Sequence, residues 1–276
     1  MKSFLLVLSS FLLFFGCSKK GPVAEKRPTV VVSVPPYVYF VERIAGQDIN
    51  AIPLIPPGSN PHLFEPSPKE VEEVRTAALW VRLHESFENK IATALQEQNK
   101  NLIVIDLCAH HSEEEDHHLW LSLKKAQEQA EAIASGLIRL YPEKESLYRA
   151  NLDSFIEELQ QLDAEIAQTL EPFKGEVILT SHPAFGYFCE DYGLMQLSIE
   201  CEGKDPLPQD LADTLEFAKN YTVRSVLLQP QYNNKGAELI AGHLSLPTHS
   251  IDPYTSDYIQ NLKELVHLIA QTSHRD

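Results

Sequence analysis

The amino-acid sequence predicts an α/β protein with two lobes, each built on a parallel sheet, that are joined by one long rigid helix. Short β-branched and apolar runs alternate with helical patterns, as in parallel sheets that are covered by helices. This alternation occurs twice, on either side of one uninterrupted helical stretch at 142–170. A chain of 276 residues is long enough for two domains that each bury a core.

Eight short runs predict the strands, four in each lobe. An N-terminal lobe is expected over 29–141 and a C-terminal lobe over 173–276. In the N-terminal lobe, helical patterns at 68–78 and 87–96 separate the strands. The predicted strands are 29–34, 51–55, 79–83 and 102–107 in the first lobe, and 176–180, 195–199, 225–229 and 247–251 in the second.

A linking helix is expected at 142–172, because Pro142 suits a first helical turn and Pro172 ends the pattern. At 1.5 Å per residue it would be about 40 Å long, so we interpret it as a stiff strut between the lobes. The alternative is a coiled coil between chains, but roughly four heptads without neighbouring repeats favour a monomer. The apolar stripe recurs at steps of three and four residues and consists of Tyr148, Leu152, Phe155, Leu159, Leu162, Ile166 and Leu170.

The first 28 residues are typical of an exported protein with a lipid anchor. Residues 1–16 combine a positive charge with an apolar run that is too short to span a bilayer of about 30 Å, and they predict a signal peptide. Cys17 directly follows Gly16, as in bacterial lipoproteins, where this cysteine receives the lipid. Residues 17–28 are polar and predict a flexible tether. We therefore expect a periplasmic or cell-surface protein held to the membrane at Cys17; a plain signal peptide cleaved nearby is the alternative.

The composition excludes one class of partner and is compatible with another. The formal net charge is −16, from 23 Lys and Arg against 39 Asp and Glu, which argues against nucleic acid because phosphate binding needs a basic face. An acidic chain is compatible with a cationic ligand. Four cysteines are too few for a disulfide scaffold. Eleven histidines are unusual, and four of them fall within residues 110–118.

Metal-capable side chains follow four of the predicted strands. His62 comes after the second strand, and a loop that contains His118 comes after the fourth. His182 and Asp252 follow strands of the second lobe. Because ligands bind beyond the carboxyl ends of the strands in open α/β sheets, we expect these residues to meet in a cleft between the lobes. Three imidazoles and one carboxylate suit a four-coordinate Zn²⁺.

Four segments resemble motifs of the metal-binding receptors of bacterial ABC transporters, in the zinc/manganese cluster. Residues 61–68 (PHLFEPSP) resemble P-H-x-[YF]-E-P-[ST]-P, and residues 118–121 (HLWL) resemble H-x-W-L. Residues 181–188 (SHPAFGYF) are similar to a motif with the core H-x-A-[FY]-G-Y-F, and residues 250–253 (SIDP) to the aspartate-bearing segment. The resemblance implies a receptor rather than an enzyme. The receptor would bind Zn²⁺ through His62, His118, His182 and Asp252 and deliver it to a membrane ABC permease.

Two positions depart from the family pattern. The second motif is usually preceded by Pro, but here it is preceded by His117. Either His117 or His118 is therefore the second ligand, and the fixed distance to Trp120 favours His118. Gln229 stands where many family members carry Glu, which removes an acid near the cleft.

The loop at 109–118 (AHHSEEEDHH) suggests a second role in metal binding. Paired histidines on both sides of four acidic residues make a flexible, weak metal site, and zinc-type members of the resembling family often carry such a loop. We interpret His110, His111 and His117 as a low-affinity collector of metal. A solvated acidic loop is the alternative.

The cysteines beyond Cys17 carry a separate prediction. Cys189 and Cys201 lie twelve residues apart, around one predicted helix and one strand, and are a candidate disulfide in an oxidising compartment. Cys108 would then remain as an unpaired, buried thiol.

Three alternatives to a zinc receptor stay open. A receptor of the same type would bind Mn²⁺ or Fe²⁺, but manganese prefers oxygen ligands, so His182 and the loop of histidines and acids favour zinc. A zinc-dependent hydrolase would need an open position for water, and a fourth protein ligand leaves no obvious place for it. An adhesin-like surface lipoprotein is also compatible with the sequence.

Overall fold

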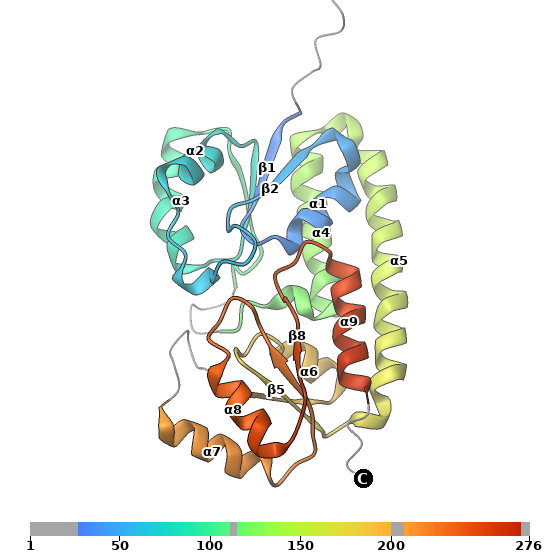
Figure 1. Ribbon diagram of the computed structural model, residues 1–276. Helices are drawn as coiled ribbons and strands as arrows, with labels where there is room; N and C mark the ends of the chain where they lie inside the picture. Colours follow the sequence, from blue (N-terminus) through green and yellow to red (C-terminus); the bar gives the residue numbers. More distant parts are fainter. Residues whose placement is uncertain (1–26, 111–114, 200–206, 272–276) are drawn as a thin grey trace, which may run out of the picture.

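The computed structural model describes residues 27–110, 115–199 and 207–271. They form two α/β lobes, one above the other in Figure 1, with a long helix along one side of both. The predicted signal peptide, Cys17 and nearly all of the tether lie outside the described residues. Within the described ranges, no helix is both long and apolar enough to cross a membrane.

The N-terminal lobe is built on a four-stranded parallel sheet in the order β2-β1-β3-β4. Residues 30–32 and 79–81 in its two central strands are fully buried, as expected for strands that are covered on both faces. The elements are β1 (Thr29–Val32), α1 (Pro36–Ala45), β2 (Asn50–Pro53), α2 (Pro68–Thr76), β3 (Leu79–Arg82), α3 (Ser86–Gln98) and β4 (Ile103–Asp106).

The C-terminal lobe repeats this plan, with four parallel strands in the order β6-β5-β7-β8. In each sheet the chain order reverses beside an inner strand, and such switch points are where α/β folds bind ligands. All eight predicted strands are confirmed, with ends shifted by at most two residues. The elements are β5 (Val177–Thr180), α6 (Gly186–Tyr192), β6 (Met195–Ser198), α7 (Pro208–Ala218), β7 (Val223–Leu228), α8 (Lys235–Leu244), β8 (Thr248–Ser250) and α9 (Tyr258–Ala270).

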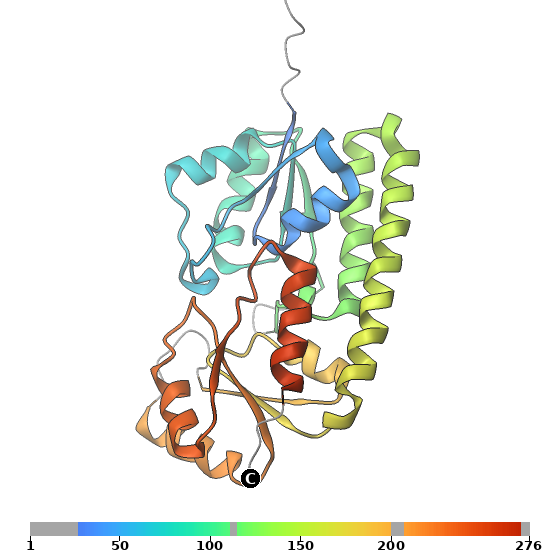
Figure 2. The same ribbon diagram turned by 45° about the vertical axis from the view of Figure 1, so that its right-hand side comes forward.

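The predicted long helix is α5 (Glu145–Leu170), with a short 3₁₀ turn on each side of it, at Pro142–Lys144 and Glu171–Phe173. The predicted apolar stripe is buried except for Leu152, which is half-buried. α4 (Leu123–Leu140), a helix that the sequence analysis did not single out, packs alongside α5 together with α1 and α9 (Figures 1 and 2). The chain therefore covers the stripe with its own helices.

One hydrophobic core runs through both lobes. It extends from the N-terminal sheet through α4, α5 and α9 to Phe185 and Phe188 in the C-terminal lobe. Two hydrogen bonds reinforce this connection: Trp120 Nε1 donates to the Pro253 carbonyl (2.9 Å), and the Tyr258 hydroxyl donates to the Trp120 carbonyl (2.5 Å). A second, smaller cluster lies within the C-terminal lobe. The two-lobe α/β fold that the sequence predicts is therefore confirmed, and its lobes are joined by more than the long helix.

Gly136 lies where α4 packs closely on the N-terminal sheet, so a substitution at this position tests that packing. A Cβ at this position would lie 2.8 Å from Cγ1 and Cδ1 of Ile105 and 3.1 Å from Cδ1 of Leu79. We expect Gly136→Ala to lower the free energy of unfolding by about 1–3 kcal/mol, the usual cost of overpacking a core. Urea unfolding measures this. In the control, Gly242→Ala in α8, a Cβ meets nothing within 4 Å, so stability should rise by up to about 1 kcal/mol. An unchanged stability of Gly136→Ala would contradict the close packing of α4.

Candidate metal site

His62 reaches the site from a short turn that follows β2. Pro61 begins the 3₁₀ turn Pro61–Leu63, and the Asn60 side-chain oxygen accepts a hydrogen bond from the His62 backbone N–H (2.9 Å). Proline fixes its own backbone angle, and an Asn side chain stabilises a turn by bonding two residues ahead. The imidazole is thus presented by a rigid segment, and its side chain is 29% exposed.

His118 reaches the site from the loop after β4, immediately before the 3₁₀ turn Leu119–Leu121. Asp116 Oδ1 accepts two hydrogen bonds from His118, one from the backbone N–H (2.9 Å) and one from Nδ1 (2.6 Å). Because a carboxylate can only accept, Nδ1 carries a ring proton. Nε2 lies within hydrogen-bond distance of the Tyr254 hydroxyl (2.7 Å).

His182 reaches the site from the loop after β5 and is the most deeply buried of the three predicted histidine ligands. Its backbone N–H donates to Gln229 Oε1 (2.6 Å), and its ring stacks on the Tyr232 ring at a centroid distance of 4.0 Å. Burial, followed by the charges of His118 and His62, lowers the pKa of His182 far below its usual value. The imidazole is therefore held neutral, which is the form that binds a metal ion.

The three imidazoles converge from both lobes. One ligand-capable atom from each of His62, His118 and His182 lies within 4.8 Å of the others, and the two Nε2 atoms of His62 and His182 are 3.2 Å apart. Among the described residues, no second group of three or more His, Cys, Asp or Glu side chains comes together in this way. Since these residues follow β2, β4 and β5, the carboxyl ends of the two sheets face a common space. Three imidazoles in such a space can bind Zn²⁺.

Asp252, the predicted fourth ligand, does not belong to this group. Its Oδ1 accepts hydrogen bonds from Gln231 Nε2 (2.6 Å) and from the Tyr254 backbone N–H (2.8 Å), so this oxygen joins its own loop to the loop after β7. Asp252 also lines a surface cavity of about 290 Å³ together with residues of α9. The structure thus brings together three of the four predicted ligands.

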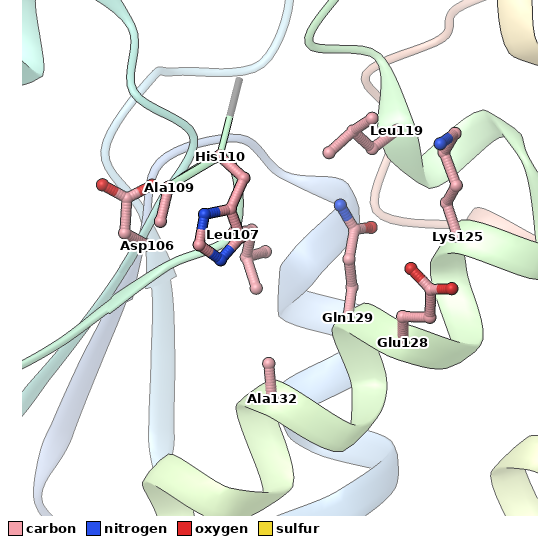
Figure 3. Close-up of a pocket in the computed structure, with 9 residues that line it drawn as sticks. All are labelled: Asp106, Leu107, Ala109, His110, Leu119, Lys125, Glu128, Gln129 and Ala132. Atoms are coloured by element: carbon pink, nitrogen blue, oxygen red, sulfur yellow. The ribbon is translucent and has the colours of Figure 1, made fainter. Parts of the chain in front are cut away.

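The histidines of the acidic loop are placed differently from one another. His118 belongs to the converging group and His117 does not, although both are buried. His110 is exposed and lines a cavity of about 220 Å³ beside α4, where Figure 3 shows its ring near Leu107 and across the cavity from Gln129. His111 lies outside the described residues, so the role of this loop in collecting metal stays a prediction.

Only two of the three cysteines beyond Cys17 lie within the described residues. Cys189 is buried, and its predicted partner, Cys201, lies outside the described residues. Their pairing therefore stays a prediction. Cys108 is buried and free, as expected, and burial together with the nearby Asp106 raises the pKa of its thiol.

Glu85 is an acidic neighbour of the site that the sequence analysis missed. It is 8% exposed, and its Oε2 lies 3.7 Å from His62 Nδ1. Burial alone would raise the pKa of Glu85, but His62 above all, and also His117 and His118, lower it. A buried carboxylate thus faces the imidazoles as an anion. Its position in the sequence could have indicated this role, because Glu85 follows β3 as the histidines follow their strands.

Glu88 holds the turn that presents Glu85. It is fully buried, and its carboxyl group accepts hydrogen bonds from the backbone N–H groups of Leu83 (3.1 Å) and Glu85 (2.9 Å) and from the Ser33 hydroxyl. Burial raises the pKa of Glu88 to about 8, even though the hydrogen bond from Ser33 acts in the opposite direction.

The position and motifs of these residues identify the class of protein. A fold of two α/β lobes with a metal-binding group between them is that of a solute-binding receptor. A family described as the periplasmic component A of the zinc-uptake complex matches residues 30–272, and the chain belongs to this family. It is therefore an extracytoplasmic zinc-binding receptor for ABC zinc import.

Similar proteins agree with this assignment. A putative metal-binding protein of Chlamydia trachomatis serovar D is 31% identical, over 94% of this chain and 96% of its own length. The crystal structure of ZnuA has a TM-score of 0.82 at 32% identity, and the match covers 88% of this chain and 98% of that one. The zinc-binding protein AdcA of Streptococcus pyogenes serotype M3 is 27% identical over 91% of this chain, which spans only 56% of the length of AdcA.

The raised pKa of Glu88 makes the stability of the fold depend on pH. The folded protein keeps this proton up to about pH 8, whereas the unfolded chain loses it near the ordinary value of 4.5. The folded state therefore binds more protons in this window, and the free energy of unfolding falls as pH rises, by at most about 1.4 kcal/mol per pH unit. Glu88→Gln, which keeps an amide oxygen as acceptor, should remove this contribution. Urea unfolding of the zinc-free protein between about pH 5 and 8 measures it, and parallel curves for variant and wild type would contradict the assignment.

Proposed function

We propose that this protein captures Zn²⁺ at His62, His118 and His182, in the space between its two lobes, and delivers the ion to a membrane ABC permease without catalysing a reaction. The convergence of three imidazoles from both lobes is the observation that supports this most strongly. Membership of the zinc-uptake family supports zinc as the cargo. The AdcA relatives, which are named zinc-binding proteins, agree with this choice.

The donor atoms favour zinc over manganese or iron. Imidazole nitrogens suit zinc, whereas manganese is better served by carboxylate, carbonyl and water oxygens. A tetrahedral zinc ion takes a fourth ligand, and we propose Asp252 for this position. Its Oδ1 would then exchange the hydrogen bond from Gln231 for the ion. Four protein ligands would leave no place for an activated water, which supports a carrier rather than a hydrolase.

Removal of single ligands tests the site. We expect His62→Ala and His182→Ala each to weaken Zn²⁺ binding by more than about 100-fold, because loss of a residue that merely orients a ligand already costs 10–100-fold. His243→Ala is the control, since His243 is exposed on α8 and its Nδ1 bonds the Leu239 carbonyl of its own helix. Titration against a competing chelator, repeated with Mn²⁺ and Fe²⁺, measures the affinities. Wild-type zinc affinity in either variant would refute the site, and an unchanged affinity in Asp252→Asn would refute the fourth ligand alone.

We also propose that a lipid on Cys17 anchors the protein, as a monomer, to the membrane that carries the permease. The sequence of residues 1–28 supports this proposal. A relative from Streptococcus pneumoniae R6, 28% identical over 93% of this chain, is named the zinc-binding lipoprotein AdcA. An anchored receptor would keep its cargo close to the transporter.

Substitution of Cys17 separates anchoring from metal binding. We expect Cys17→Ser to release the protein from membranes, because the hydroxyl group cannot replace the thiol as the site of lipid attachment. Zinc affinity should stay unchanged, since the ligands lie at least 45 residues further along the chain. Membrane fractionation and zinc titration of the same preparation measure the two effects. Continued sedimentation of the variant with membranes would show that something other than this lipid anchors it.

A further inference from the structure

We propose that Asp116 of the N-terminal lobe positions the ligand His118, and that it does so only while its carboxylate rests against Gly186 of the C-terminal lobe. Docking of the two lobes then prepares one of the zinc ligands. The inference rests on the three-histidine site proposed above. Two separate contacts of one carboxylate carry it.

One oxygen of Asp116 fixes the orientation of His118. Oδ1 accepts both from the backbone N–H and from Nδ1 of His118, so it holds the ring and the main chain together. With the proton on Nδ1, Nε2 is left to bind a metal ion. A carboxylate that accepts from the far nitrogen of a metal-binding histidine sets its tautomer and raises its basicity. Asp116 is thus a positioning residue and not one of the three converging side chains.

The other oxygen of Asp116 lies against the opposite lobe. A Cβ built on Gly186 would be 2.9 Å from Asp116 Oδ2, which is closer than real Cβ atoms approach other heavy atoms. Gly186 begins α6, four residues after His182, and it is not among the glycines with positive φ. The backbone conformation therefore does not require glycine here. A side chain here would instead have to displace the Asp116 carboxylate.

Neighbouring contacts hold α6 in place at this seam between the lobes. Asp191 on α6 accepts hydrogen bonds from Ser122 Oγ (2.6 Å) and Lys124 Nζ (2.7 Å), at the start of α4. Lys125 Nζ lies 4.5 Å from the centroid of the Tyr187 ring, also on α6. Residues that closely follow His118 thus hold the helix that begins with Gly186. A shift of α6 would move the surface on which Asp116 rests and, through it, the imidazole.

A double-mutant cycle tests this coupling. We expect Asp116→Ala to weaken Zn²⁺ binding by about 10–100-fold, the usual effect of losing a partner that orients a histidine ligand. Gly186→Ala should also weaken binding, because the new methyl group displaces the carboxylate, but it should have no further effect in the Asp116→Ala background. Gly242→Ala is the matched control. It makes the same change within a helix, in open space, and should bind zinc as the wild type does.

A second measurement on the zinc-free protein reports the position of the proton directly. Two-dimensional ¹H–¹⁵N spectra of the imidazoles distinguish a proton on Nδ1 from one on Nε2. We expect the His118 proton on Nδ1 in the wild type and in Asp116→Asn, whose amide oxygen still accepts. In Asp116→Ala and Gly186→Ala it should redistribute toward Nε2. A general loss of stability would not produce this difference between the Asn and Ala variants.

Three results would overturn the proposal. Equal weakening by Gly186→Ala with and without Asp116 would show that the glycine acts independently of the carboxylate. A proton that stays on Nδ1 of His118 in Asp116→Ala would show that Asp116 does not position the ring. A wild-type protein that does not bind zinc would refute the underlying site, and this failure is distinguishable because the imidazole spectra need no metal.

Discussion

Three imidazole rings that lie this close together cannot all be protonated without strong repulsion between like charges, and burial keeps one of them, His182, neutral. If two of them were protonated, like charges would stand only a few ångströms apart in a buried space. The structure prevents this for His182 by removing water from it. For His118, the hydrogen bond to Asp116 places a ring proton on Nδ1, on the side of the ring away from Nε2. A ring nitrogen without a proton is the one whose lone pair can bind a metal ion.

The two lobes support their histidines by different chemistry. In the N-terminal lobe, His118 bonds Asp116, and Glu85 lies near His62. In the C-terminal lobe, the fully buried Gln229 accepts from the backbone of His182. A buried carboxylate in that place would carry a large desolvation penalty unless a charge compensated it. The amide oxygen accepts this hydrogen bond without carrying a charge, while the amide nitrogen of Gln229 is buried and has no hydrogen-bond partner among the described residues.

The fold and the three histidines could be predicted because they depend on local patterns. Apolar runs identify strands, and a ligand that follows a strand is placed by the backbone alone, as His62 and His182 are. The orientation of Asp252 could not be predicted, because its hydrogen-bond partner Gln231 comes from a different loop, 21 residues earlier. Asp116 illustrates the same limit. In sequence it is one of four acids in a charged loop. Only the tertiary structure shows that one of its oxygens bonds His118 in the N-terminal lobe while the other lies against Gly186 in the C-terminal lobe.

The partner of the long helix could not be predicted from the stripe on α5 alone. α4 supplies one side of the contact that buries α5. Helix partners are decided by the whole chain rather than by the periodicity of one segment. The choice between His117 and His118 also depends on the tertiary structure. The two residues are adjacent and both buried, yet only His118 belongs to the group of three converging histidines.

The apolar core that continues from one lobe into the other limits how far the lobes can separate. If the lobes separated like two halves of a clamp, they would expose core surface at about 25 cal/mol per Å², and they would break the hydrogen bonds that Trp120 makes with Pro253 and Tyr258. The core therefore resists a hinge-like opening of the lobes, and it keeps the carboxyl ends of the two sheets, where the three histidines converge, facing one another.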